Sequence, residues 1–174
     1  MDIGILSDSH FHANEVLDRS REFSQTFRRL QRAFEGVDHL IHAGDVVCKE
    51  FVRELEKIAP VSVVRGNMDD VAGITVWPKV LTIEFEGIKF GVGHRLEYFS
   101  RLDDPDIRVF VYGHTHIPSV KENPQGVLLI NPGSVTRPKT IEKKFLFRQD
   151  ANPRPTVAII NVEDGLISSF LKKL

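Results

Sequence analysis

The sequence has little of several features that would point to particular classes of protein. It contains a single cysteine, Cys48, so no disulfide can form within the chain, as we expect for a reducing compartment. No apolar run approaches the roughly 20 residues that a membrane-spanning helix needs, and no basic segment precedes an apolar one at the start. We therefore expect a cytoplasmic protein with no membrane partner.

Neither sign of charge is in excess. The chain has 23 basic and 24 acidic residues among its 174, and its formal net charge is -1. Because this balance lacks the positive charge of a nonspecific nucleic-acid binder, we do not expect a nucleic-acid partner. The hydrophobic share of 41% is that of a folded protein. The length predicts one domain over residues 1–174.

The first half of the chain alternates between strand and helix patterns. Short apolar runs predict strands at residues 3–6, 39–43 and 61–64. Apolar residues at helical spacing predict one helix over residues 12–35 and another over residues 51–58. This order of strand, helix, strand, helix, strand is typical of parallel βαβ units.

The second half has a different pattern. Two strand-type runs, residues 80–85 and 88–92, flank Glu86-Gly87, which is typical of a hairpin turn. Further strands are predicted at residues 107–112, 127–130, 155–162 and 166–170. We expect antiparallel hairpins here. The predicted fold class is α/β, with two packed sheets that form a β-sandwich flanked by helices.

Polar residues of metal-binding types follow five of the strand-type runs. In α/β proteins, sites form where loops leave the carboxyl ends of strands, so five such ends at one edge would place these side chains in one cleft. Any one segment alone also fits a helix cap or a turn, but five together predict a shared site. The segments are Ser7-Asp8-Ser9-His10, Gly44-Asp45, Gly66-Asn67-Met68-Asp69, Gly93-His94 and Gly113-His114-Thr115-His116.

The donor atoms of these segments indicate the kind of metal site. Seven ligands exceed the four of a tetrahedral zinc site and fit two divalent ions that share one carboxylate. A set of oxygen and imidazole donors without thiolate suits Mn²⁺, which we expect first, and also Fe, Zn²⁺ or Ni²⁺. The predicted ligands are Asp8, His10, Asp45, Asn67, His94, His114 and His116.

With these segments the chain resembles the calcineurin-like metallophosphoesterases, and among them the small single-domain phosphodiesterases of bacteria and archaea. The family's pattern is Asp-x-His, Gly-Asp, Gly-Asn-x-Asp/Glu, His and Gly-His-x-His, which spans residues 8–116 here. The turn Asn131-Pro132-Gly133-Ser134 also resembles this branch. The resemblance implies a four-layer α-β-β-α fold. It assigns Asp8, His10 and His116 to one ion, Asn67, His94 and His114 to a second, and Asp45 to both.

The implied activity is hydrolysis of a small phosphodiester or phosphomonoester. A hydroxide that bridges two ions about 3.5–4 Å apart would attack the phosphorus in line, while the ions neutralise the developing charge. Larger phosphatases of the family have a histidine after the asparagine of the third segment, where it assists the leaving group. Here Met68 stands there. Because a thioether cannot donate a proton, we expect diesters or activated esters to be favoured, and we assign no other catalytic side chain.

Residues beside the metal ligands are candidates for contact with the substrate. Arg95 is interpreted either as a phosphate contact or as a surface residue. The resemblance implies that the residue matching Asp69 orients the leaving-group histidine of the larger phosphatases; because Met68 replaces that histidine here, Asp69 is interpreted first as a turn or cap residue. Residues 137–154 are rich in basic residues and are interpreted either as a solvated loop or as a lid. The candidate substrate-binding residues are Asn67, Arg95, His12 and Arg137.

Two other functions fit the same resemblance. The eukaryotic retromer complex contains a similar small subunit that works chiefly as a protein-interaction scaffold, although a scaffold should tolerate loss of metal ligands and all seven are present here. A nuclease is the other alternative, and the charge balance counts against it. Exposed strands of the second half could also pair between subunits in a homo-oligomer.

Overall fold

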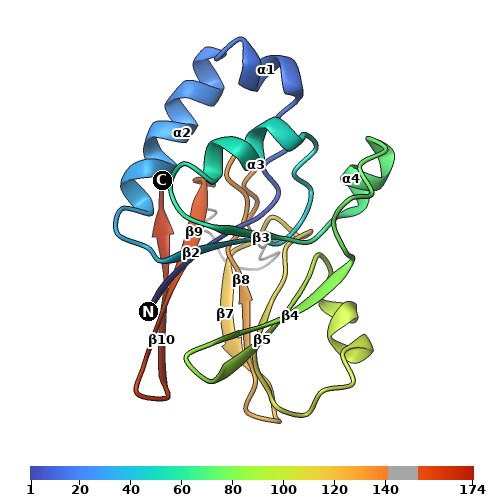
Figure 1. The fold of residues 1–174 in the computed structure, drawn as a ribbon, viewed down its shortest axis with the longest axis vertical. Helices are drawn as coiled ribbons and strands as arrows, with labels where there is room; N and C mark the ends of the chain where they lie inside the picture. The colour runs from blue at the N-terminus through green and yellow to red at the C-terminus, as the bar shows by residue number, and fades with distance from the viewer. Residues whose placement is uncertain (141–152) are drawn as a thin grey trace, which may run out of the picture.

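A computed structural model describes residues 1–140 and 153–174, in which ten strands form two five-stranded sheets (Figure 1). The first sheet has the order β10-β9-β1-β2-β3 and the second the order β4-β5-β6-β8-β7. The first sheet contains β1 (Asp2–Leu6), β2 (His39–His42), β3 (Val61–Val63), β9 (Thr156–Glu163) and β10 (Leu166–Lys173). The second contains β4 (Val80–Phe85), β5 (Ile88–Gly93), β6 (Ile107–Val111), β7 (Ser119–Glu122) and β8 (Leu128–Asn131).

The pairing of the strands in the first half follows the prediction. In the second half, parallel pairs are present in addition to the predicted antiparallel hairpins. Strands β1, β2 and β3 are parallel, and β4–β5, β7–β8 and β9–β10 are antiparallel hairpins. The middle of the second sheet is parallel, because crossovers join β5 to β6 and β6 to β8. The sequence analysis missed β7, whose residues Ser-Val-Lys-Glu contain one apolar side chain.

The described part of the chain contains four α-helices: α1 (Ala13–Leu17), α2 (Arg21–Ala33), α3 (Lys49–Leu55) and α4 (Asn67–Val71). The prediction of one continuous helix over residues 12–35 is wrong. Arg19 adopts a left-handed backbone with φ of 48°, and Ser20 begins a new helix by accepting a hydrogen bond from the Phe23 N–H at 3.2 Å. A serine cap of this kind satisfies a backbone donor at the start of a helix and restarts the helical pattern.

The apolar residues divide into layers that match the predicted sandwich. Phe23 and Phe51 belong to a core cluster between the helices and the first sheet. Ile5 and Val111 belong to a second cluster between the two sheets. On the outer face of the second sheet, Phe110 packs under the short 3-10 helix η1 (Leu96–Arg101). The layers are therefore helices, sheet, sheet and helix, as the resemblance implies.

Two features of the periphery bear on function. No helix of the described residues is long and apolar enough to cross a membrane. Strand β10 forms an edge of the first sheet, and its side chains Leu166 and Phe170 are 75% and 55% exposed. Of the segment predicted as a loop or lid, residues 141–152 lie outside the described part of the chain.

Candidate metal centre

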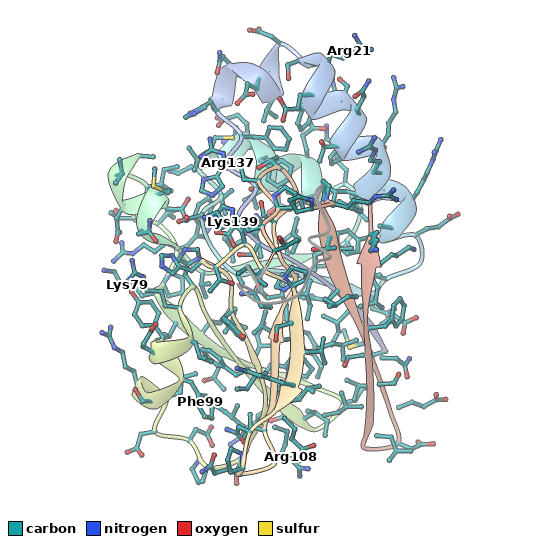
Figure 2. All side chains as sticks on the ribbon, turned by 180° about the vertical axis from the view of Figure 1, so that it is seen from behind. Arg21, Lys79, Phe99, Arg108, Arg137 and Lys139 are labelled. Carbon is teal, nitrogen blue, oxygen red and sulfur yellow. The ribbon has the colours of Figure 1, made fainter. Side chains whose placement is uncertain are left out.

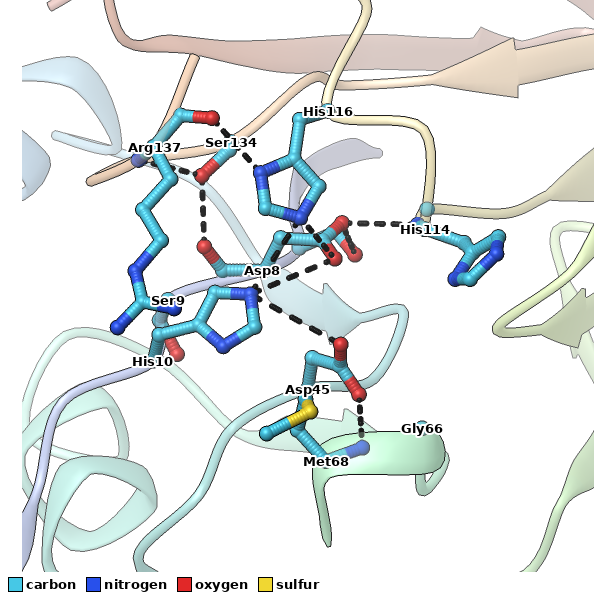
Figure 3. A network of polar contacts seen from close by, with 12 residues as sticks. Asp8, Ser9, His10, Asp45, Gly66, Met68, His114, His116, Ser134 and Arg137 are labelled. Carbon is cyan, nitrogen blue, oxygen red and sulfur yellow. Dashed lines mark hydrogen bonds and ion pairs between the residues drawn. The ribbon is translucent and has the colours of Figure 1, made fainter. Parts of the chain in front are cut away.

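Five of the seven predicted ligands come together at the ends of the strands. Figure 3 shows Asp8, His10, Asp45 and His116 among them. Asp8, His10 and His116 form one group, called here the Asp8 cluster. Asp8, Asp45 and His94 form a second group, the Asp45 cluster. In each group one donor atom from every residue lies within 4.8 Å of the others, and all five residues are buried. Asp8 belongs to both groups, whereas the resemblance gives the bridging role to Asp45.

The predicted ligands are contributed by both sheets rather than by one sheet edge, so the expectation of a single edge is wrong. Segments after β1, β2 and β3 come from the first sheet, and segments after β5 and β6 come from the second. The two sheets are joined at this point by the His114 backbone N–H, which donates to Asp8 Oδ2 at 3.0 Å. The packing of one sheet on the other therefore builds the centre.

Most of these ligands sit on strained backbone. Asp8, His10, Asp45, His114 and His116 have φ between 49° and 67°. Residues with a Cβ rarely adopt this left-handed region, and such conformations concentrate at functional sites where the surrounding structure holds them in place. The strained backbone therefore indicates that these residues are held in place for a function, at a cost in local stability.

In Asp8 and in Asp45, one carboxylate oxygen accepts hydrogen bonds from the protein and the other faces an imidazole. Asp8 Oδ2 accepts from Ser7 Oγ at 2.7 Å and from the His114 N–H, while buried Oδ1 has no hydrogen-bond partner in the described chain. Asp45 Oδ1 accepts from the Met68 N–H at 2.8 Å, and its Oδ2 lies 3.3 Å from His94 Nε2. Each cluster thus has a fixed carboxylate with an oxygen aimed at an imidazole.

The facing imidazoles are oriented by backbone carbonyls. His94 Nδ1 donates to the Ala43 carbonyl at 2.8 Å, and His116 Nδ1 donates to the Arg137 carbonyl at 2.7 Å. With Nδ1 protonated, a neutral imidazole keeps a lone pair on Nε2. That lone pair faces a carboxylate oxygen, at 3.2 Å for His116 and Asp8. Two lone pairs at this distance repel unless a proton or a metal cation lies between them.

The protonation of the ligands reflects these pairings. Burial lowers the pKa of His94, but the nearby carboxylates of Asp45 and Asp8 outweigh it and the net shift is upward. Asp8 raises the pKa of His116. Burial lowers the pKa of His10 to about 4, so its ring is neutral at pH 7. Burial would raise the pKa of Asp45, yet the adjacent His94 imidazole and the Met68 N–H hold it below its usual value.

Two predicted ligands, Asn67 and His114, lie outside these clusters. Asn67 begins α4, and its Oδ1 is buried with no hydrogen-bond partner in the described chain. The half-buried His114 ring stands edge-on to His94, with centroids 5.2 Å apart. Both residues adjoin the Asp45 cluster, but neither joins the group of donors within 4.8 Å of one another.

The candidate substrate-binding residues are placed differently from one another. The Arg137 side chain extends beside His10 (Figure 3), and its charge adds to the burial that lowers the pKa of His10. Arg95 acts in the same way on His114. His12 is exposed at the start of α1, where its N–H donates to Glu15, and no contact joins its side chain to the clusters within the described ranges.

Residues of the turn after β8 support the centre from behind, which the sequence analysis did not assign. Ser134 Oγ donates to the Asp8 carbonyl at 2.7 Å and accepts from the Arg137 N–H at 2.8 Å. Asn131 Nδ2 donates to the Gly113 carbonyl at 2.8 Å. Both side chains are fully buried, so they hold the ligand loops and do not line the cleft. Their place in a turn that resembles the family was the only sequence signal for them.

The residues present fit divalent metal ions. Burying a polar atom without a partner is costly, and native structures rarely do so unless an ion or water satisfies it. Three such atoms cluster here, and each is a good ligand for a divalent cation: Asp8 Oδ1, Asn67 Oδ1 and His94 Nε2. The fold and the donor set together define an α/β protein with a candidate metal centre.

The sequence profile of the calcineurin-like phosphoesterase superfamily domain matches residues 1–165. The chain therefore belongs to this family, as the sequence analysis predicts. A probable metallophosphoesterase of Methanothermobacter thermautotrophicus is 35% identical over 153 residues, covering 83% of each chain. A phosphodiesterase of Methanocaldococcus jannaschii is 29% identical over 152 residues, covering 76% of this chain and 83% of that one.

A similar solved structure confirms the fold. Vps29 from Entamoeba histolytica, crystallised in complex with Zn²⁺, superimposes with a TM-score of 0.65 at 20% identity, and 99% of each chain is covered. At this identity the likeness concerns the fold alone.

Proposed function

We propose that this protein hydrolyses phosphodiesters with the help of two divalent metal ions, most readily Mn²⁺. The observation that carries the proposal is the pair of buried carboxylate–imidazole units, Asp8 with His116 and Asp45 with His94, whose facing atoms need a proton or a metal cation between them. The membership of a phosphoesterase family and the similarity to an archaeal phosphodiesterase support it.

The predicted ligands are assigned to the two ions in two sets. Asp8, His10 and His116 would hold one ion, and Asp45 and His94, completed by Asn67 and His114, would hold the other. When bound, two such ions lower the pKa of water and neutralise charge on phosphoryl oxygens.

The cationic side chains and Met68 set the preference for substrate. Arg137 beside His10 and Arg95 beside His114 place positive charge on two sides of the centre, where their guanidinium groups can bind phosphoryl oxygens that are not transferred. Met68 lies next to Asp45 (Figure 3) and has no proton to give to a leaving group. The protein should therefore prefer diesters with good leaving groups. His12 is too exposed to carry a defined contact and stays a minor candidate.

The test is hydrolysis of bis(4-nitrophenyl) phosphate by the purified full chain with Mn²⁺. We expect release of nitrophenolate that chelation with EDTA abolishes and that Asp45→Asn lowers by about a thousandfold or more, since removing preorganised charge stabilisation costs several kcal/mol. Asp70→Asn is the matched control, because Asp70 is exposed and, within residues 1–140 and 153–174, forms ion pairs only with Arg65 and Lys79, each at 3.3 Å. Full activity in Asp45→Asn would contradict the proposal.

A scaffold function is the second candidate, and strand β10 favours it. Its exposed Leu166 and Phe170 form part of a free sheet edge in the described chain, and an edge with apolar side chains can pair with another chain. Vps29 has the same fold and is known in complex with Zn²⁺, so metal binding alone does not separate the two functions. Binding of two ions without hydrolysis of any diester would favour the scaffold, and release of nucleotides from single-stranded nucleic acid would favour a nuclease.

A further inference from the structure

Asp69 is a buried carboxylate that neither the metal clusters nor the substrate contacts use. It lies in the short helix α4, two residues after Asn67, and is fully buried. Its side chain accepts three hydrogen bonds, all from backbone N–H groups. A carboxylate with three such donors is held rigidly, and it holds its partners equally firmly.

The three donors belong to two different loops. Asp69 Oδ2 accepts from the Asp45 N–H at 3.0 Å and from the Gly66 N–H at 2.7 Å. Its Oδ1 accepts from the Val47 N–H at 2.7 Å. The bond to Gly66 is an ordinary helix cap, but the other two leave α4 and reach the loop after β2. The cap role expected for Asp69 from the sequence therefore explains one bond of the three.

The loop that Asp69 holds is strained at the residues it contacts. Asp45 has φ of 55° and Val47 has φ of 75°. A β-branched residue in the left-handed region is a genuine outlier that needs support from its surroundings. The Asp69 carboxylate supplies that support, because it binds the N–H of both strained residues.

The same two loops also meet through Asp45 itself. A Cβ added to Gly66 would overlap Asp45 Oδ1 and lie 2.5 Å from Asp45 N, so the backbones are in direct contact. The Met68 N–H, from the helix that carries Asp69, binds Asp45 Oδ1. Asp45 is thus held at its backbone by Asp69 and at its carboxylate by Met68, which leaves Oδ2 directed at His94.

We propose that Asp69 is a positioning residue that sets Asp45 for its metal ion. It does so through the backbone of the Asp45–Val47 loop and touches neither ion. This inference rests on the proposed function only in assuming that divalent ions bind the two clusters. It predicts that loss of the Asp69 carboxylate weakens the Asp45 cluster most. The Asp8 cluster should lose less, because it meets the Asp45 loop through the His10 N–H, which donates to the Asp45 carbonyl at 3.1 Å, and through the Asp8 N–H, which donates to the Gly44 carbonyl at 3.0 Å.

The experiment is a calorimetric titration of the metal-free full chain with Mn²⁺. In Asp69→Asn the side chain keeps its shape, but an NH₂ group replaces one oxygen and faces a backbone donor. We expect one of two Mn²⁺ ions to bind about 10- to 100-fold more weakly, the usual effect of losing a residue that orients a ligand. The neighbouring Asp70→Asn serves as the matched control and should bind both ions as the wild type does.

Thermal unfolding of the metal-free variants separates positioning from folding. A purely structural role would lower the melting temperature of Asp69→Asn while the folded protein bound both ions normally, and that result would overturn the inference. If Asp69→Asn does not fold, the double variant Val47→Gly/Asp69→Asn removes the strain at the loop, since glycine adopts a positive φ readily. Unchanged affinity for both ions in that variant would also overturn it.

The outcome is independent of catalysis. A wild-type protein that binds two ions but hydrolyses no diester would refute the proposed function, while the titration would still decide the role of Asp69.

Discussion

The two metal clusters are built on the same plan but are supported differently. In each cluster, one carboxylate oxygen accepts hydrogen bonds from the protein and the other faces an imidazole. The Nδ1 of that imidazole donates to a backbone carbonyl. In the Asp8 cluster, Asp8, His10 and His116 lie together, and all three have a positive φ. In the Asp45 cluster, two of the predicted ligands, Asn67 and His114, lie outside the group. The difference teaches that the fold assembles the donors of the Asp8 cluster more completely than those of the Asp45 cluster.

The largest expected effects come from two glycines that lie against the carboxylates of the clusters. A Cβ on Gly113 would overlap Ser7 Oγ and lie 2.6 Å from Asp8 Oδ2, and a Cβ on Gly66 would overlap Asp45 Oδ1. Because Asp8 belongs to both clusters, Gly113→Ala should weaken the binding of both Mn²⁺ ions by about 100-fold, whereas Gly66→Ala should weaken chiefly the ion of the Asp45 cluster. Calorimetry measures both affinities.

The control for these glycines is Gly87→Ala in the β4–β5 turn. Gly87 has a positive φ, of 76°, which Gly66 and Gly113 do not have, and a Cβ there meets nothing within 4 Å. It should lose some stability and bind both ions normally. Equal losses in Gly66→Ala and Gly113→Ala would erase the distinction between the clusters.

The next largest effect is expected for Asn131, which stabilises the loop that carries His114 and His116. Its amide donates to Gly113 and Thr115, and it accepts from the Gly133 N–H. Asn131→Ala leaves buried groups unpaired, so the free energy of unfolding should fall by about 2 kcal/mol in urea titrations of the metal-free protein.

The matched control for Asn131 is Asn123→Ala. Asn123 Oδ1 also accepts two backbone hydrogen bonds, but at a largely exposed turn. Water can replace them there, so the loss should be well under half as large. A similar loss in both variants would mean that burial of Asn131 adds nothing.

Variants of Arg137 and Arg95 test the two clusters through the expected contacts with the substrate. Arg137→Ala, beside the Asp8 cluster, and Arg95→Ala, beside His114, should each raise KM for the diester by about tenfold with a smaller change in kcat. This is the pattern of a lost ground-state contact worth about 1.4 kcal/mol. Arg108→Ala, at the far end of β6 (Figure 2), is the control. An unchanged KM in both variants would remove these residues from the substrate site.

The smallest expected effect concerns His42, which lies behind the Asp8 cluster and contacts Ser9 Oγ at 3.0 Å. Burial lowers the pKa of His42 to about 3, below the value of about 6.5 in an unfolded chain. The unfolded chain therefore takes up a proton that the folded chain does not. The contribution of neutral His42 to the free energy of unfolding is therefore fully present above pH of about 6.5 and is lost as the pH falls below it.

Between pH of about 6.5 and 5.5 we expect His42 to cost about 1 kcal/mol of unfolding free energy in the metal-free protein. His42→Gln should show a shallower pH dependence in urea titrations over this range. If both proteins lose stability in parallel, His42 is not the group responsible.

Much of the fold could be predicted because its signals are local. The parallel first half and two hairpins, β4–β5 and β9–β10, follow from apolar runs and turn residues such as Glu86-Gly87. Two features escaped: β7, whose exposed polar side chains carry no strand pattern, and the break before α2, where Arg19 turns within an otherwise helical stretch. Both are decided by neighbours in space that a periodic pattern does not reveal.

By itself, the sequence determined which atoms could bind metal, because every predicted ligand directly follows a strand whose pattern is local. Only the tertiary structure decided how those atoms are used. The His114 N–H reaches Asp8 across 106 residues, and the Ala43 and Arg137 carbonyls fix the tautomers of His94 and His116. Hydrogen bonds between distant segments form only when the two sheets pack together, which is why the roles of Ser134, Asn131 and Asp69 could be seen only in the folded chain.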